Sequence, residues 1–469
     1  MSRESNLAKN TSILAIGTFL PKITSFITLP ILTGCLTKDE YGTYDLIIVL
    51  VSLLLPAITL QIQTAAFRFL IDHKKKEDRV SSIVTTIFAF IVPVSLIALV
   101  ILYFCMYKFD PLIRISICIY FFSDLLVNAT RQIVRGLSQN LKYSISAIIS
   151  SGSQLIFVTL LVWKMNTGLL GGIISLAAAE TVSFIYLFFS SRLIHFLKPK
   201  MLSKKLLKEM LTYSWPMIPN SMSMWVMRMS DRLVITVVMG PAANAAYSVA
   251  NKIPQLLSIA QNTFTMAWQE NASIVSKDED APKYYSTMYR TLFDLMAGAM
   301  MMIIACTPPL FIILVRGDYS EAYIQIPILL LAMFFYAMSA FLGGIYVAYM
   351  KTKSVGITTI IAAALNIIID VSLIHFIGLY AASLSTLVSY IFLFFYRIID
   401  VRKIVPINYD KKHMIFVFII MTLISALCML HNNIANIFNF VIALIAFVVM
   451  NKEFLKVIFN SLKAKLVRR

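Results

Sequence analysis

Apolar runs long enough to cross a lipid bilayer recur along the whole chain, and this repetition limits the possible folds more than any other feature. A membrane-spanning helix needs about 20 predominantly apolar residues. Such runs occur at about 11–34, 42–70, 81–104, 110–134, 143–163, 168–194, 209–239, 243–270, 284–315, 321–350, 354–376, 378–398, 414–430 and 434–450. They predict about fourteen helices, the last two of them short, with both termini on one side of a membrane.

The charge content agrees with this prediction. Only 14% of the 469 residues are charged and 59% are hydrophobic, whereas about 25% of the residues in a soluble domain are charged. The connections are too short to hold a compact catalytic domain. The five cysteines are scattered without disulfide or metal-site spacing. We therefore expect an all-α membrane protein that is not an enzyme and holds no metal centre or cofactor.

The basic residues predict which side each connection faces. If the N-terminus is cytoplasmic, about 30 of the 41 Lys and Arg residues fall in cytoplasmic segments, as the positive-inside rule requires. The opposite segments hold Lys38, Lys108, Lys164 and Arg316. The net charge of +18 therefore indicates topology rather than nucleic-acid binding. We expect a multi-pass protein of the bacterial cytoplasmic membrane with both termini in the cytoplasm.

A basic stretch from Arg192 to Lys208 separates two similar halves of the sequence. Each half opens with a proline-bearing run and reaches a tyrosine after a short outer connection. Such repeats are common in transporters, whose substrate sites lie at the repeat interface. We predict a six-helix lobe at 1–197, a second six-helix lobe at 198–403, and a helix pair with a basic tail at 404–469.

Charged residues remain inside the predicted spans, where each costs about 2.5–3.5 kcal/mol near the bilayer centre. The basic ones are Lys22, Arg68, Arg114, Arg131, Arg228, Arg232 and Lys252. The acidic ones are Asp45, Asp124, Glu180, Asp231, Asp294 and Asp370. Arg68, Arg114, Arg131 and Asp45 lie near helix ends, so we expect their side chains to reach the membrane surface.

The charges at Arg228, Asp231 and Arg232 share one helix face, because they are spaced by three and four residues. They line a wet cavity, or Arg228 and Asp231 form a structural ion pair.

Polar stripes accompany these charges on the first two runs of each half. The longest follows 243–270, and we predict that a water-filled passage between the halves is lined by Asn220, Asp231, Asn251, Gln255 and Asn262. The alternative is hydrogen bonding between packed helices, worth about 0.6 kcal/mol per contact.

Two stretches also resemble a known family. Leu7–Asp72 contains Phe19-Leu20-Pro21-Lys22 and Glu40-Tyr41-Gly42, and Tyr213–Ala272 contains Tyr213-Ser214-Trp215-Pro216, Asp231-Arg232, Tyr247-Ser248-Val249-Ala250-Asn251-Lys252 and Ala267-Trp268. These stretches resemble polysaccharide-biosynthesis flippases of the Wzx type. That family belongs to the MOP superfamily together with MurJ-like lipid II flippases and MATE exporters.

The resemblance implies two six-helix lobes that work by alternating access, with an undecaprenyl-diphosphate-linked oligosaccharide as cargo. It implies that cationic residues meet the diphosphate, which places Lys22, Arg68, Arg228, Arg232 and Lys252 in the substrate site. It also implies that the last two helices shape a groove for the lipid tail. Glycosyltransferases and a polysaccharide polymerase are the expected partners.

Proton or sodium coupling is a further expectation, with Asp124, Glu180 and Asp370 as candidate carboxylates. Two other functions remain open. A MATE-like ion-coupled exporter of small molecules would share the architecture, but cationic drugs favour an acidic lumen. A membrane-embedded polysaccharide polymerase or ligase would need a sizeable outer loop, and the sequence offers none.

Overall fold

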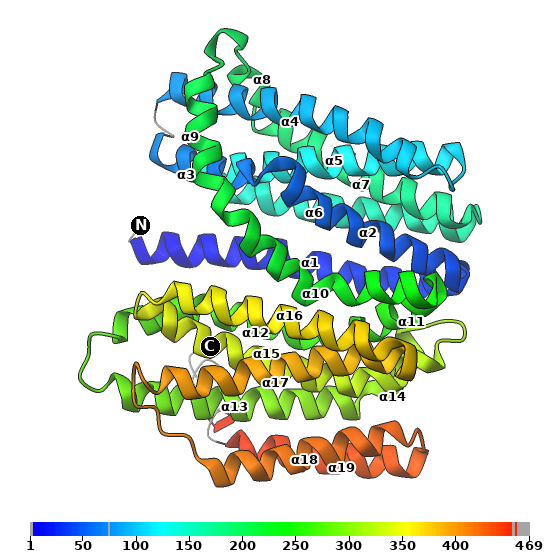
Figure 1. The fold of residues 1–469 in the computed structure, drawn as a ribbon, viewed down its shortest axis with the longest axis vertical. Helices are drawn as coiled ribbons and strands as arrows, with labels where there is room; N and C mark the ends of the chain where they lie inside the picture. Colours follow the sequence, from blue (N-terminus) through cyan, green and yellow to red (C-terminus); the bar gives the residue numbers. More distant parts are fainter. Residues whose placement is uncertain (1–2, 74–75, 453–454, 457–469) are drawn as a thin grey trace, which may run out of the picture. The chain divides into compact units, whose positions relative to one another are not determined.

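The computed structural model describes residues 3–73, 76–452 and 455–456, and all regular elements in these ranges are helices (Figure 1). Contacts divide the chain into two compact units: unit 1 is Met1–Trp225 with Gly240–Ala245, and unit 2 is Val226–Met239 with Ala246–Arg469. The predicted fold class is therefore confirmed. The boundaries proposed at 197 and 403 concern sequence repeats rather than contact units, and they stay a prediction.

Unit 1 begins its helices where the sequence supplies a cap. Thr37 and Glu40 form a capping box at the start of α2, and Asp110 caps α5, whose first residue is Pro111. The elements are α1 Arg3–Cys35, α2 Lys38–Thr59, α3 Ile62–His73, α4 Glu77–Cys105, α5 Pro111–Gly136, α6 Asn140–Phe157, the π-helix η1 Val158–Lys164, α7 Gly168–Ser190, α8 Leu193–Phe196, the 3₁₀ turn η2 Pro199–Met201, and α9 Lys204–Ser214.

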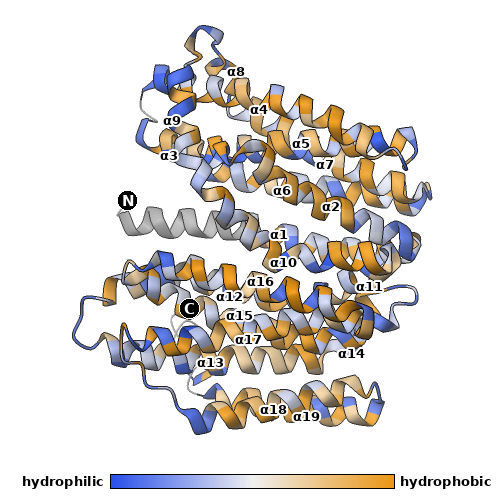
Figure 2. Ribbon diagram, in the orientation of Figure 1, coloured by the Kyte–Doolittle hydropathy of each residue, from blue (hydrophilic) through white to orange (hydrophobic). Residues whose placement is uncertain are grey.

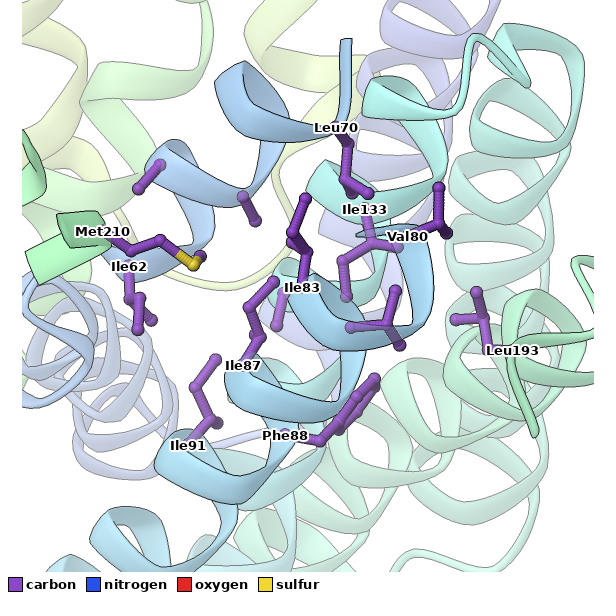
Figure 3. Packing of buried hydrophobic residues seen from close by; sticks show 14 of the residues in the cluster. Ile62, Leu70, Val80, Ile83, Ile87, Phe88, Ile91, Ile133, Leu193 and Met210 are labelled. Carbon is purple, nitrogen blue, oxygen red and sulfur yellow. The ribbon is translucent and has the colours of Figure 1, made fainter. Parts of the chain in front are cut away.

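A core of branched apolar side chains holds α3, α4, α5, α8 and α9 together (Figure 3). On α4, Val80, Ile83, Ile87 and Ile91 recur every three or four residues and are at most 2% exposed. This spacing places them on one helix face. The opposite face of α4 carries exposed apolar residues, as expected for a helix that faces lipid.

Unit 2 is organised around α15, whose side chains are mostly buried and which packs against α12, α13, α17 and α18. The 3₁₀ turn η3 Trp215–Met217 precedes α10, and both α10 and α11 contribute residues to the two units. The remaining elements are α10 Ile218–Met239, α11 Pro241–Lys252, α12 Pro254–Val275, α13 Ala281–Ala305, α14 Thr307–Leu314, α15 Ser320–Ala348, α16 Thr352–Ile377, α17 Leu379–Val401, α18 Lys411–Met429 and α19 Asn433–Met450.

Eleven helices in the described ranges are long and apolar enough to cross a membrane. They are α2, α4, α5, α6 continued by η1, α7, α13, α15, α16, α17, α18 and α19. Phe19–Cys35 of α1 is a shorter apolar helix. Figure 2 shows hydrophobic residues along these helices and hydrophilic ones gathered in the connections at their ends. The count of fourteen spans stays a prediction.

The predicted run at 42–70 is two helices rather than one, which corrects the sequence prediction. Leu60 and Gln61, between α2 and α3, have left-handed φ angles of 48° and 58°. The buried hydroxyl of Ser214 donates to the Leu60 carbonyl at 2.8 Å. Ser214 therefore satisfies an acceptor that the break removes from the helix.

Prolines divide three other predicted runs, which are also not single helices. The run at 284–315 contains α13 and α14, separated at Cys306, with prolines in the first turn of α14. The run at 209–239 contains α9, η3 and α10, with Pro216 inside η3. The run at 243–270 contains α11 and α12, separated at Ile253, and α12 begins with Pro254. Proline supplies no N–H for the helix ladder and clashes with the preceding turn, so the helix ends just before it.

The C-terminal helices α18 and α19 pack against α13, and α18 also contacts α15. Phe418 of α18 lies edge-on to Phe293 of α13, with ring centroids 5.7 Å apart. The Asn451 amide, after α19, donates to the carbonyl of Asp294 at 3.2 Å. The predicted helix pair is thus a packed part of unit 2.

Candidate functional site

A buried carboxylate, Asp231 on α10, is the centre of a polar cluster inside unit 2. Its side chain is 5% exposed. One carboxylate oxygen accepts from the Tyr247 hydroxyl and from the Thr386 hydroxyl, both at 2.7 Å. Asp231 therefore uses hydroxyl donors on α11 and α17. Arg228 donates instead to the Tyr336 hydroxyl at 3.0 Å, so the alternative of an Arg228–Asp231 ion pair is wrong.

Two residues of α16 complete this cluster. Asn366 is 1% exposed, and with its amide oriented to suit its neighbours, Nδ2 lies 3.1 Å from the second oxygen of Asp231. Asp370, four residues further on the same helix face, is also 1% exposed. Neither oxygen of Asp370 has a hydrogen-bond partner among the residues that the structure describes, and Asp231 acts on it electrostatically.

Four of these side chains, those of Asp231, Asn366, Asp370 and Thr386, carry carboxylate, amide or hydroxyl oxygens, and each residue is at most 8% exposed. Burying carboxylates without compensation is costly. A hard cation such as Na⁺ favours oxygen ligands of this kind, and a proton would equally relieve the charge. The arrangement of Asp231, Asn366, Asp370 and Thr386 is therefore suited to binding a small cation.

Unit 1 contains a partly buried acidic group, and this one has a cationic partner. Glu180 on α7 accepts from the Ser150 hydroxyl at 2.8 Å and lies 3.4 Å from the Arg131 guanidinium. Arg131 also donates to Ser183 at 3.2 Å and is 19% exposed. Our expectation that Arg131 reaches the membrane surface is therefore wrong, because it pairs inside the helix bundle.

Unit 1 also contains Asp124, which is partly buried, and Asp45, which is buried. Asp124 accepts from the Asn128 amide at 2.9 Å, four residues along α5. Asp45, expected at the membrane surface, is only 4% exposed and faces the Asn244 amide at 3.4 Å. The expectation that Asp45 reaches the membrane surface is therefore wrong, because the segment 241–245 packs against this end of α2. Within that segment, the Asn244 amide also donates to the Gly42 carbonyl at 3.0 Å.

The five predicted substrate-binding cations occupy different environments. In unit 1, Lys22 is an exposed residue of α1, and Arg68, exposed near the end of α3, pairs with Asp72 at 3.1 Å. In unit 2, Arg232 is 7% exposed, Arg228 faces Tyr336, and Lys252 is the half-buried last residue of α11. Lys22, Arg232 and Lys252 each have an interaction partner. Their role towards a cargo stays a prediction.

The predicted polar lining is less continuous than the sequence suggested. Asn251 lies in the last turn of α11, and its side-chain amide donates to the Tyr247 carbonyl at 2.9 Å. Gln255 and Asn262 lie on the next helix, α12, beyond the break at Ile253. Gln255 is half-buried and Asn262 is exposed. The side chain of Asn220 lies outside the part of the chain that the structure describes.

Sequence reasoning did not connect Tyr247, Asn366 and Thr386 with Asp231. The spacing of Asn366 and Asp370, four residues apart with only isoleucines between them, was a usable signal for two polar groups on one helix face. Thr386 gave no signal, because single threonines are common in membrane helices.

Solved structures of membrane transporters share this fold. The chain is similar to a lipid II flippase MurJ in an inward closed conformation, with a TM-score of 0.71 and 15% identity, covering 95% of this chain and 99% of that one. It is similar to an inward-facing multidrug resistance MATE family transporter of the MOP superfamily, with a TM-score of 0.59, 14% identity and coverage of 81% and 98%. A MOP superfamily transporter from Pyrococcus furiosus gives a TM-score of 0.57, 14% identity and coverage of 84% and 94%.

The chain is therefore a multi-pass membrane protein with the fold of MOP superfamily transporters. The model of the family described as polysaccharide biosynthesis protein matches residues 7–269. The chain belongs to this family, which confirms the resemblance seen in Leu7–Asp72 and Tyr213–Ala272. No curated protein matches the chain.

Proposed function

We propose that the chain is a flippase that moves undecaprenyl-diphosphate-linked oligosaccharide repeat units from the cytoplasmic to the outer leaflet of the bacterial cytoplasmic membrane. The family match over residues 7–269 carries this proposal, and the flippase-like fold supports it. Both termini are cytoplasmic in this proposal. The protein acts as a transporter rather than an enzyme, and it works beside glycosyltransferases and a polymerase.

The physical problem for such a cargo is its headgroup. Sugar hydroxyls and the diphosphate lose their water partners in hydrocarbon, at a cost that prevents unaided crossing. In the proposed mechanism, Lys22, Arg68, Arg228, Arg232 and Lys252 compensate the diphosphate in a cationic cavity that opens alternately to each side. The polyprenyl tail stays in lipid throughout.

Coupling to a cation movement is part of this proposal, and the observed partners favour Asp370 over the two other predicted carboxylates. Glu180 lies beside a guanidinium and Asp124 accepts a hydrogen bond from an amide. Asp370 and Asp231 instead interact electrostatically as an acidic pair, and neither Asp370 oxygen has a hydrogen-bond partner among the described residues. Binding of Na⁺ or a proton at Asp370 and Asp231 would discharge this pair. Asp370→Asn is expected to remove the dependence of transport on the cation gradient, whereas Asp124→Asn retains it.

Deletion of the gene tests the function. We expect lipid-linked repeat units to accumulate on the cytoplasmic face of the membrane, where an added periplasmic glycosidase cannot reach them, and the intact gene to restore export. Normal export in the deletion strain contradicts the proposal. Unchanged lipid-linked units together with increased sensitivity to cationic drugs would instead identify the MATE-like alternative.

A further inference from the structure

A polar cavity separate from the proposed cation cluster opens at one end of unit 2. Its volume is about 530 Å³, and it lies between the first turns of α13 and the segment that leads into α18. Basic and aromatic side chains dominate its lining: Tyr289, Arg290, Tyr409, Lys411, Lys412 and His413. Figure 2 shows hydrophilic residues at the start of α18.

The charge of this cavity is incompletely balanced. Asp410 is the acidic residue of its lining, and it caps α18 by accepting from the His413 backbone N–H at 3.1 Å. Its distance from the Arg290 guanidinium is 4.0 Å, and both side chains are about half exposed. Within the described ranges Lys411 and Lys412 have no carboxylate partner. The start of α18 adds the positive end of a 19-residue helix dipole.

The lining of this cavity includes a tyrosine whose buried hydroxyl has no hydrogen-bond partner in the described part of the chain. This residue, Tyr409, is 6% exposed. Its ring packs edge-on against Tyr289, with centroids 4.7 Å apart, and Arg402 covers its face at 5.1 Å. Phenylalanine would supply the same packing without burying a polar group. The hydroxyl is therefore a donor that lacks an acceptor.

The position of the cavity indicates where the acceptor comes from. α13 and α18 both have the length and composition of membrane spans, and both begin at the cavity. The positive-inside pattern places this end at the cytoplasmic surface, at the depth of lipid phosphates. Basic pockets between membrane helices on this side are suited to phosphate headgroups.

We propose that this cavity binds a phosphate group, with Arg290, Lys411 and Lys412 supplying charge and the Tyr409 hydroxyl donating a hydrogen bond. The phosphate belongs to an anionic phospholipid of the cytoplasmic leaflet or to a soluble phosphate ester. The site is distinct from the cargo site and does not depend on the proposed transport function.

Titration of the purified full-length protein in detergent with phosphatidylglycerol tests the site, with bound lipid counted by native mass spectrometry. Tyr409→Phe is expected to weaken binding about tenfold, because a hydrogen bond to a charged acceptor is lost. Lys411→Gln with Lys412→Gln is expected to weaken it about fivefold per lysine. Without added lipid, Tyr409→Phe should melt at a temperature no lower than that of the wild type, since the buried hydroxyl has no partner to lose.

Lys204→Gln with Lys205→Gln is the matched control. These adjacent lysines open α9, which Ser203 caps just as Asp410 caps α18, but they do not line the cavity. This control should bind phosphatidylglycerol normally. If glycerol 3-phosphate, but not phosphatidylglycerol, binds with the same dependence on Tyr409, a soluble ester is the ligand. If the Tyr409 and lysine variants bind phosphatidylglycerol and glycerol 3-phosphate with the same affinity as the wild type, the proposal is overturned.

Discussion

Arg397 shows how a single charge can be structural inside a membrane helix bundle. Its side chain is 4% exposed. The guanidinium donates to the Ser339 carbonyl at 2.8 Å and to the hydroxyls of Thr358 and Thr359 at 3.0 and 3.1 Å. It therefore joins α15, α16 and α17 by hydrogen bonds alone. The sequence did not reveal this, because a basic residue near the end of an apolar run also fits a topology signal.

Replacing this arginine by a side chain of similar length without donors should therefore destabilise unit 2. Arg397→Met leaves buried carbonyl and hydroxyl groups unpaired, which is expected to lower the free energy of unfolding by about 2–4 kcal/mol. Thermal unfolding in detergent measures this. Arg79→Met, an exposed arginine at the start of α4, is the control and should leave the melting temperature unchanged. A wild-type melting temperature for Arg397→Met would contradict the assignment.

The cationic residues at Lys22 and Arg232 permit a different residue-scale prediction, on transport rather than stability. If they compensate the diphosphate, Lys22→Ala and Arg232→Ala should reduce export more than tenfold while the protein still inserts, because each removes about 1.4 kcal/mol or more of cargo stabilisation. Export is measured as surface polysaccharide in the complemented deletion strain. Lys22→Arg keeps the charge and should retain export. Lys164→Ala, at an exposed residue of η1, is the control, and normal export by both alanine variants rejects the role.

At the scale of elements, the close approach of α2 to the segment after α10 makes a sharp prediction. A Cβ on Gly42 would overlap the Pro241 carbonyl, and both belong to unit 1. Gly42→Ala is thus expected to separate these segments and disturb the Asn244 hydrogen bond to the Gly42 carbonyl. Gly152→Ala in α6 meets nothing within 4 Å and should be neutral or stabilising by up to about 1 kcal/mol. The amount of membrane-inserted protein and its melting temperature are expected to be lower for Gly42→Ala than for Gly152→Ala. Equal values for the two variants would contradict the close contact between Gly42 and Pro241.

The elements also show how much of the fold the sequence could reveal. Apolar runs of spanning length predicted the helices, because lipid forces every backbone group into an internal hydrogen bond. Pro254 was a readable break. The break at Leu60 and Gln61 was not readable, since neither residue is Gly or Pro and the residue that satisfies the Leu60 carbonyl, Ser214, lies far along the chain.

The candidate site was predictable to a smaller extent. The cost of charge in a membrane singled out Asp231 and Asp370 individually. Their shared cluster depends on Thr386, 155 residues from Asp231. Only tertiary packing brings such residues together, and the sequence pattern of one helix contains no information on which distant helix it meets. The same reason explains why Arg131 was assigned to the surface, although Glu180 on α7 pairs with it.

At the scale of the whole molecule, the proposed function predicts that transport responds to the membrane potential. Over a complete cycle the cationic side chains return to their starting positions, so only the cargo and any coupled cation cross. A diphosphate-linked cargo carries about two negative charges, and an inside-negative potential of about 100 mV favours moving them outward by roughly 4–5 kcal/mol. Collapsing the potential in reconstituted vesicles should therefore lower the outward accumulation of cargo.

The matched comparison is a cargo linked through one phosphodiester, which carries about half the charge and should lose about half as much accumulation free energy. Asp370→Asn should remove the response to a cation gradient but keep the response to potential, because the cargo charge is unchanged. Accumulation that ignores the potential for both cargoes would show that the diphosphate does not cross as an anion. The whole-molecule mechanism would then need a counter-cation travelling with each headgroup, and the acidic pair of Asp231 and Asp370 would be the first place to look for it.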